Sequence, residues 1–356
     1  MGKYNNYKIF KYVYWHAIEG LPLYKEYPNQ YYDNNHYGII FSTIIAPFAI
    51  LPDWLGLMLW NVANTLILFY AIRHLPLTNN QKKLIYWFSF IELMTAQSVQ
   101  QFNISVGAFI LLSFIFIEKK KEFWAACIIV IGTFIKIYPI VGLAFFLFSK
   151  QKTKFILSLL FWSILFFFLP ILYTSGFDYV SSQYMEWGEA LKIKNIKNMF
   201  APSQNVSLLG LVRKLTGISS YNDLCLIIPG LCLFFIPYVR VGQYKYLRFR
   251  LMILANVLLF VVLFSSGTEA SGYIIAMIGV AIWYVCSPSK HRVYNLVLFI
   301  ATLVIVGIST TEIVPRTLRL GFIQPFVLKS WMCIFVWFTI CYESILLDFN
   351  NKKKNL

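Results

Sequence analysis

Charge is scarce in this sequence, and acidic charge is the scarcest. Only 13% of the 356 residues are charged, whereas 59% are hydrophobic. A soluble globular domain carries about 25% charged residues, so a soluble chain of this composition could not cover its own surface. The 15 acids face 31 Lys and Arg residues, which leaves a formal net charge of +16. The apolar composition excludes a soluble nucleic-acid-binding protein, and we interpret the chain as an integral membrane protein.

Several chemical signatures are missing as well. The six cysteines show no CxxC spacing and fall in or beside apolar runs, which favours buried free thiols over disulfides or a metal site. No HExxH, GxSxG, P-loop or Rossmann pattern occurs, so we predict no cofactor and no bound metal, with the need for a divalent cation left open. No repeat is visible that would support an inverted-repeat transporter.

The beginning of the chain lacks the apolar core of a signal peptide. Its first 36 residues are polar and aromatic, and a cleavable signal requires a short apolar stretch behind a basic start. Because the arguments below put this segment on the outer side of the membrane, we expect a transmembrane helix to precede it.

Apolar runs of membrane-spanning length dominate the rest. A spanning helix needs about 20 apolar residues, and nine runs approach this length. They are 54–72, 84–100, 103–117, 155–173, 223–239, 251–264, 272–286, 293–310 and 324–346. Two further stretches fit poorly: 38–51 is short and contains Pro47, and 123–148 is too long for one span and is interrupted at Lys136-Ile137-Tyr138-Pro139.

Basic residues predict the orientation of these runs. More than half of the 31 Lys and Arg residues lie in six short segments, which the positive-inside rule assigns to the cytoplasm. These are 73–83, 118–122, 149–154, 240–250, 288–292 and 348–354. The assignment requires 38–51 to stay at the outer interface and 123–148 to enter and leave from the cytoplasmic side. A pair of half-helices can do this where it lines a protein cavity.

The predicted architecture follows from this orientation. We expect an all-α, polytopic membrane bundle with re-entrant half-helices and outer-face loops. Residues 1–53 would form a first outer loop with an interfacial helix, and 54–346 the multi-spanning domain, which includes the outer loop 174–222. Residues 347–356 would form a basic cytoplasmic tail. Most acids then fall on the outer side, which favours an active site there.

The first loop combines aromatic rings with amides and acids. Its candidates are Asn6, His16, Glu19, Asp33 and Tyr37. Proteins bind sugars with such a mixture, because rings stack on apolar sugar faces while amides and carboxylates bond to hydroxyls. The alternative is an interfacial aromatic belt with solvated polar residues.

Polar residues also interrupt the apolar runs. Gln101 and Asn103 lie at an outer junction between two spans, where they could bind substrate or bond to neighbouring helices. Glu92 falls in the middle of a predicted span and is either functional or protonated and bonded to another helix. Lys136 stands at the break in 123–148, where a lipid phosphate would be a natural partner. The alternative for Lys136 is snorkelling toward the interface.

Two outer segments complete the set of candidates. Gln204, Asn205 and Arg213 belong to the long outer loop, and Glu269 follows a span at the outer face. A carboxylate at the lip of a cavity can act as a base or bind a hydroxyl, although a simple polar turn explains Glu269 equally well.

These segments, taken in order, resemble glycosyltransferase family 87, polytopic membrane enzymes of the GT-C fold. The resemblance covers nearly the whole chain, and the order and spacing of the segments carry it rather than any single motif. Its marks are Leu23-Tyr24, Tyr37, Ala46-Pro47-Phe48, Leu51-Pro52, Trp60-Asn61, Gln100-Gln101-Phe102-Asn103, Phe134-Ile135-Lys136-Ile137-Tyr138-Pro139, Gln204-Asn205-Val206-Ser207-Leu208 and Arg213. The stretch from Glu269 to Tyr273 is similar to a branch of related bacterial membrane proteins.

The resemblance implies a reaction and its partners. A sugar, hexose or pentose, would pass from a polyprenyl-phosphate sugar to a lipid or glycan acceptor on the outer face of the bacterial inner membrane. Membrane lipids would surround the protein, and no nucleic acid would bind. Such enzymes use a carboxylate in the first outer loop as base, and Lys136 fits the role of a cation beside the phosphate leaving group.

One position departs from the family pattern. Mannosyltransferase members have an Asp where this chain has Asn6, which opens the stretch Asn6-Tyr7-Lys8-Ile9-Phe10. An amide cannot take up a proton at neutral pH, so we expect the base to be Asp33, Glu19 or Glu269, in that order. The remaining alternatives are a transporter or flippase for lipid-linked sugars and a catalytically silent partner subunit.

Overall fold

The computed structural model describes residues 4–199, 204–218, 220–288, 292–309 and 311–350. These residues form helices and connecting turns without a β-strand. The chain divides into two compact units, one formed by 1–74 and 97–194 and the other by 75–96 and 195–356. The expected all-α fold is therefore confirmed. The division of the sequence into outer loop, membrane domain and tail depends on the position of the bilayer and stays a prediction, and residues 351–356 of the tail lie outside the described residues.

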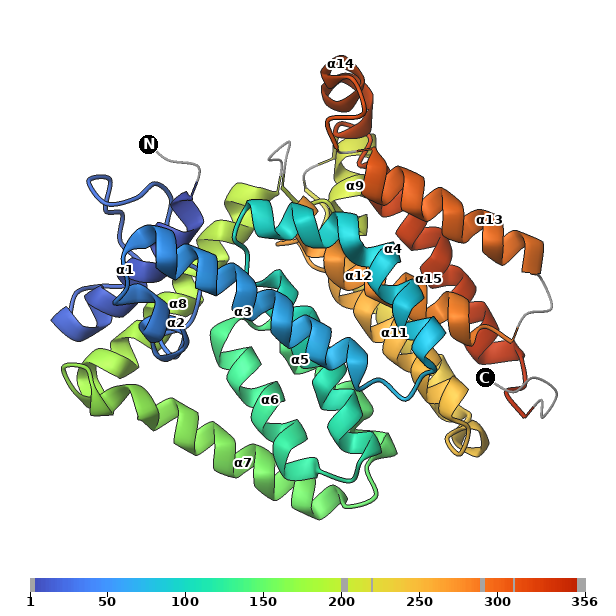
Figure 1. Ribbon diagram of the computed structural model, residues 1–356, viewed down its shortest axis with the longest axis horizontal. Helices are drawn as coiled ribbons and strands as arrows, with labels where there is room; N and C mark the ends of the chain where they lie inside the picture. Colours follow the sequence, from blue (N-terminus) through green and yellow to red (C-terminus); the bar gives the residue numbers. More distant parts are fainter. Residues whose placement is uncertain (1–3, 200–203, 219, 289–291, 310, 351–356) are drawn as a thin grey trace. The chain divides into compact units, whose positions relative to one another are not determined.

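The first unit holds the N-terminal helices and the interrupted stretch (Figure 1). Its elements are α1 (Asn5–Glu19), α2 (Phe41–Ala49), α3 (Asp53–Arg73), α5 (Asn103–Glu118), α6 (Glu122–Ile135), the 3-10 helix η1 (Tyr138–Phe148), α7 (Lys152–Phe168), η2 (Leu169–Leu172) and most of α8 (Phe177–Asn198). Helix α5 packs against α3, α6 and η1, and α1 packs against α2. Residues 103–115 of α5 are all buried, which makes this helix the centre of the unit.

The second unit is built around α11 and α12. Its elements are most of α4 (Asn79–Ser98), α9 (Leu208–Thr216), α10 (Leu224–Phe235), η3 (Ile236–Val239), η4 (Val241–Gln243), α11 (Leu247–Leu263), η5 (Ala270–Gly272), α12 (Tyr273–Cys286), α13 (Arg292–Thr302), η6 (Leu303–Ile308), α14 (Arg316–Leu318), η7 (Arg319–Ile323) and α15 (Leu328–Leu346). Helix α11 packs against α12 and α15, and α15 also contacts α13 and α9.

Over the residues that the structure describes, each apolar run predicted to span the membrane lies mainly within a helix or a pair of consecutive helices. Within the described part of the chain, Asp53–Arg73 and Lys152–Leu172 are long and apolar enough to cross a bilayer. A third candidate joins Arg316–Ile323 to Leu328–Leu346 through a bend of 57°. The other apolar helices are shorter, so the number of nine spans stays a prediction.

Helix α7 exposes large apolar side chains. Leu157 is 60% exposed, Leu160 56% and Ile164 61%, and they follow one another at helical spacing. Patches of this kind on a soluble monomer mark a site that something else covers. The hydrocarbon of a bilayer is the natural cover for a helix of this length and composition.

The interrupted stretch forms a helical hairpin. Helix α6 ends at Ile135, Lys136 is extended, and η1 begins at Tyr138. The two ends of the hairpin meet, because Ser149 Oγ donates a hydrogen bond of 3.0 Å to the buried carboxylate of Glu122. The predicted break at Lys136 is confirmed, and α2, at nine residues, is too short to cross a bilayer.

Gly132 permits close packing of the two arms of the hairpin, because it has no side chain. A Cβ atom at Gly132 would lie 2.7 Å from Pro139 Cβ and 2.9 Å from Phe109 Cδ2. Contacts below 3 Å force backbone or ring to move, which typically costs about 1–3 kcal/mol. We therefore expect Gly132→Ala to lower the melting temperature of the purified protein in detergent. Gly188→Ala is the matched control, because nothing lies within 4 Å of a Cβ there; equal melting temperatures for the two variants would contradict this account of the hairpin.

Candidate functional site

The side chain of Lys136 leaves the break of the hairpin toward three neutral groups. Its Nζ donates a hydrogen bond of 2.7 Å to Asn103 Oδ1. The same atom lies 5.5 Å from the ring centre of Tyr37 and 5.1 Å from that of Tyr138. These distances are typical of cation–π contacts. The amide and the two rings therefore orient the ammonium group of Lys136.

The junction before α5 supplies the polar partners. Gln100 has a left-handed backbone, with φ of 53°, and its carbonyl accepts a hydrogen bond of 3.2 Å from Trp60 Nε1. Gln101 Oε1 accepts a hydrogen bond of 3.0 Å from the hydroxyl of Tyr37. We name Tyr37, Gln101, Asn103, Lys136 and Tyr138 the Lys136 cluster. Four of these five residues were predicted as substrate ligands from the sequence, and the structure brings those four together.

The first loop is attached to the end of α6 beside this cluster. Gly38 N donates a hydrogen bond of 3.0 Å to the carbonyl of Ile135, and a Cβ atom at Gly38 would lie 2.0 Å from Phe134 O. Only glycine permits this approach of two backbones. Because Gly38 follows Tyr37 directly, the contact fixes the ring of Tyr37 beside Lys136.

Aromatic packing supports the same ring from behind. Tyr37 stacks on Phe41, with ring centres 4.8 Å apart, and Phe10 of α1 contacts both rings edge-on at 5.0 and 5.1 Å. Trp60 and Phe102 extend this contact toward α3 and α5. Tyr37 is only 7% exposed, so its position is set by packing.

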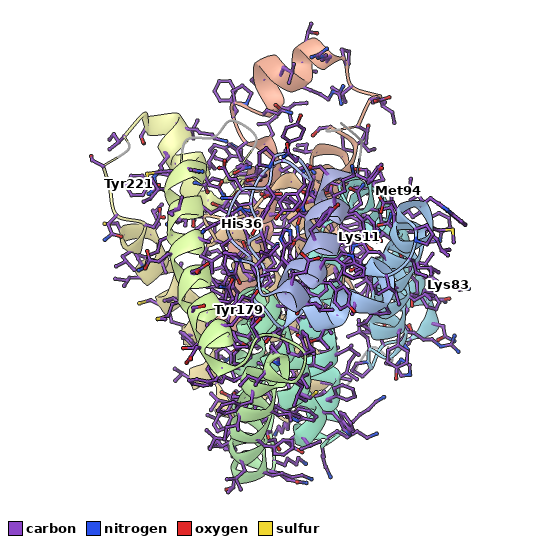
Figure 2. The ribbon with its side chains drawn as sticks, turned by 90° about the vertical axis from the view of Figure 1, so that its left-hand side faces the viewer. Lys11, His36, Lys83, Met94, Tyr179 and Tyr221 are labelled. Carbon is purple, nitrogen blue, oxygen red and sulfur yellow. The ribbon has the colours of Figure 1, made fainter. Side chains whose placement is uncertain are left out.

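The candidate acids of the first loop lie at its surface. Glu19 is the last residue of α1 and is exposed. Asp33 has a left-handed backbone, with φ of 72°, and its side chain is 68% exposed. Its Oδ1 lies 4.0 Å from His36 Nε2. The carbonyl of His36 in turn accepts a hydrogen bond of 3.0 Å from Trp187 on α8, and Figure 2 labels His36 beside this helix.

The tip that carries Asp33 is held by an amide clamp. Asn5 Nδ2 donates a hydrogen bond of 2.7 Å to the carbonyl of Tyr32, and Asn5 Oδ1 accepts one of 2.8 Å from the amide of Tyr32. Its neighbour Asn6, which stands where mannosyltransferase members have an acid, donates to the carbonyl of Val99 at 2.7 Å. Asn6 thus joins α1 to the junction before α5.

His16 belongs to an aromatic group on the same loop. Its Nε2 lies 2.8 Å from Gln30 Oε1, and its ring centre is 4.0 Å from that of Tyr27. An amide oxygen only accepts, so Nε2 carries the proton. Burial lowers the pKa of His16, against the smaller opposing effects of the Gln30 bond and of Glu19.

The remaining candidates lie in the second unit. Asn205 is fully buried with φ of 53°, and its Oδ1 accepts a hydrogen bond of 2.7 Å from Ser207 Oγ. Arg213 is 2% exposed, pairs with Asp223 at 2.7 Å and stacks on the ring of Tyr221.

The last two candidates of the second unit are Gln204, which directly precedes Asn205, and Glu269. Lys214 Nζ donates to the carbonyl of Gln204 at 3.3 Å, and burial lowers the pKa of Lys214. Glu269 precedes η5 and is half-buried. It belongs to a different unit from Asp33 and Glu19.

Sequence reasoning missed two residues. Tyr138 contacts Lys136 by its ring, and its place directly before Pro139 at the break was the available signal. Lys329 pairs with Glu92 inside the second unit at 2.7 Å. A lone lysine in the apolar run 324–346 was the same kind of signal as Glu92 itself. Among the residues that the structure describes, no three His, Cys, Asp or Glu side chains are placed to hold a metal ion.

The helical fold with its apolar surface and polar cluster defines a membrane protein with a polar site among its helices. The family model of glycosyltransferase family 87 matches residues 35–266. The match exceeds half of the chain, and the chain belongs to this family; it is a membrane glycosyltransferase. The matched range includes the Lys136 cluster and excludes Asp33, Glu19 and Glu269. No match was found among curated proteins.

The lowered pKa of His16 predicts a pH-dependent stability. Because the folded protein favours neutral His16, the unfolded chain takes up a proton at this histidine first as the pH falls. The contribution of His16 to the free energy of unfolding is therefore complete above pH 6.5, the ordinary pKa of histidine, and is lost as the pH falls below it. We expect the melting temperature to fall between pH 7.5 and pH 5.5 more steeply for the wild type than for His16→Gln. Parallel melting curves for the two proteins over this range would show that His16 does not carry the effect.

Proposed function

We propose that this glycosyltransferase moves a hexose or pentose from a polyprenyl-phosphate sugar to a lipid or glycan acceptor. The reaction would take place on the outer face of the bacterial inner membrane. The observation that carries the proposal is the cation of Lys136, held at a helix break between apolar half-helices. The family membership supports transfer of a sugar, and the donor and the side of the membrane are part of the proposal.

Lys136 is suited to a lipid-linked phosphate. Its neighbours Asn103, Tyr37 and Tyr138 are neutral, and their contacts hold the ammonium group of Lys136 in place. A polyprenyl phosphate brings both an anion that an ammonium group can bind and a chain that belongs in the bilayer. As the sugar leaves, negative charge grows on the phosphate oxygen, and a fixed cation stabilises that charge more than the ground state.

The transfer itself needs a base. A hydroxyl oxygen of the acceptor forms a bond to the anomeric carbon from the side opposite the phosphate, and the bond from that carbon to the phosphate oxygen breaks. The electron pair leaves with the phosphate, the hydroxyl proton passes to a carboxylate, and the configuration inverts. We propose Asp33 as this carboxylate, ahead of Glu19 and Glu269, because it lies at an open, clamped loop tip of the unit that contains Lys136.

The other polar residues would contact substrate. The Lys136 cluster, with Asn6 and His16 on α1, would surround the donor, and half-exposed rings of the first loop suit the faces of a sugar. Gln204, Asn205 and Arg213 are proposed as ligands of the second unit. The structure also shows them engaged with neighbouring residues.

The orientation rests on the distribution of charge. The loops at 118–122 and 149–154, which carry three lysines each, are joined by the bond between Ser149 and Glu122. Such lysine-rich loops stay on the cytoplasmic side. The break at Lys136 lies at the other end of both half-helices, which supports an outward-facing site.

One observation favours the transporter alternative. A transporter is expected to carry paired charges within the membrane, and Glu92 and Lys329 form such a pair in the second unit. A silent partner subunit would have neither transfer nor transport activity. The two experiments below distinguish the enzyme from both alternatives, because each measures transfer of a labelled sugar as well as binding of the donor.

Replacement of Lys136 tests the donor phosphate. We expect Lys136→Met to lower kcat for transfer by about 100-fold, as the loss of one charge-stabilising group does, and to weaken donor binding by a smaller factor, with Lys136→Arg less affected. The measurement uses purified protein and radiolabelled polyprenyl-phosphate hexoses. Lys152→Met, at an exposed lysine of α7, is the control and should behave as the wild type. Unchanged donor binding in Lys136→Met would exclude this role.

Replacement of Asp33 tests the base. We expect Asp33→Asn to reduce kcat by about 100-fold or more, because general-base catalysis contributes about 10²–10⁴, with donor binding kept. Asp178→Asn, at an exposed aspartate of α8, is the matched control. If Asp33→Asn keeps full kcat, Asp33 is not the base. A loss of kcat in Glu19→Gln or in Glu269→Gln would then identify the replaced glutamate as the base.

A further inference from the structure

A buried ion pair in the second unit has no part in the proposed chemistry. Lys329 Nζ of α15 lies 2.7 Å from Glu92 Oε1 of α4, and their side chains are 3% and 0% exposed. Burying two charges costs about as much as their attraction returns, so such a pair is weak evidence for stability alone. Within the described residues, no group hydrogen-bonds Glu92 Oε2. The pair therefore calls for a role besides holding two helices together.

Lys329 makes a second contact. Its Nζ lies 5.4 Å from the centre of the Tyr273 ring, at the first residue of α12. The Tyr273 hydroxyl donates a hydrogen bond of 2.7 Å to the carbonyl of Val206. The hydroxyl has one hydrogen, so Ser330, whose Oγ is 2.9 Å away, must be the donor of their shared bond. Lys329 thus contacts the ring of Tyr273, and the adjacent residue Ser330 bonds to its hydroxyl.

Val206 joins two loop segments that carry candidate ligands. Its amide donates a hydrogen bond of 2.8 Å to the carbonyl of Thr268, and Thr268 Oγ1 donates to the carbonyl of Val262 at 2.7 Å. Asn205 precedes Val206, and Glu269 follows Thr268. A displacement of Tyr273 would free the carbonyl of Val206 and loosen both segments.

We propose that Lys329, held by Glu92, is a positioning residue that fixes the segments 204–207 and 268–269 through Tyr273. The ion pair determines where Lys329 lies over the ring, and the ring determines where the hydroxyl meets Val206. The role in sugar transfer rests on the function proposed above. The positioning of Val206 does not, because it is a property of the fold that can be measured without substrate.

The test replaces the pair by a neutral one. Removing one partner leaves a buried charge alone and can prevent folding, so the main variant is the double substitution Glu92→Gln with Lys329→Met. Tyr273→Phe removes only the hydroxyl that binds Val206. Asn256→Ala is the matched control, because Asn256 is buried on α11 and accepts a hydrogen bond of 2.7 Å from Trp337 of α15, a polar contact between helices that involves neither Tyr273 nor Val206.

Hydrogen–deuterium exchange reads the positioning directly. We expect the peptides that contain Val206 and Thr268 to exchange at least 10-fold faster in the neutral-pair variant and in Tyr273→Phe, but not in Asn256→Ala. In transfer assays the first two variants should change the same kinetic parameter by similar factors. Adding Tyr273→Phe to the neutral pair should cause little further change, since both act through one bond.

Two results would overturn the proposal. One is wild-type exchange at Val206 in a folded neutral-pair variant. The other is faster exchange spread equally over the second unit and matched by Asn256→Ala, which would indicate loosening of the whole unit. If the wild type transfers no sugar from any donor, the proposed function fails, but the exchange measurement still decides whether Lys329 positions Val206.

Discussion

The first unit depends on the interruption of one apolar helix at Lys136. A continuous helix through 122–148 would bury its backbone bonds and leave no polar end inside the protein. The break, with Lys136 extended and Pro139 after it, turns the chain back and leaves a cation at the turn. Tyr37 and Gly38 of the first loop and Asn103 of α5 then join two separate segments to this point. The site is thus a consequence of how the chain reverses.

Many buried polar groups in both units hydrogen-bond to other segments of the chain, and these bonds define the structure around them. In the first unit the side-chain amides of Gln97 and Gln101 bond to Thr65 and Tyr37, and the main-chain carbonyl of Gln100 accepts a hydrogen bond from Trp60. In the second unit Glu343 accepts hydrogen bonds from Trp283, Ser287 and Asn295, which joins α15 to α12 and α13. Unpartnered polar groups cost most where water is absent. An apolar chain can therefore specify one arrangement of its helices with a small number of polar contacts.

The helices could be predicted from sequence because apolar runs are long and basic loops separate them. The break at Lys136 could be predicted as well, since a lysine and a proline interrupt one run. The gathering of the cluster could not be derived in the same way, because 64 residues separate Tyr37 from Gln101 and no local pattern reports a contact over that distance. Glu92 was recognised as unusual, but its partner lies 237 residues away. Arg213 was expected to face substrate, and its ion pair with Asp223 shows that a buried arginine also serves the fold.

The central claim is that the turn of the hairpin binds the phosphate of a lipid-linked sugar. The most direct measurement is photocrosslinking of the full-length protein in membranes with a polyprenyl-phosphate analogue that carries a photoreactive group beside the phosphate. Mass spectrometry of the labelled peptides should find the label in residues 132–139 and at the 97–103 junction, and excess unlabelled donor should remove it. Labelling confined to the second unit, or labelling that unlabelled donor does not reduce, would contradict the account.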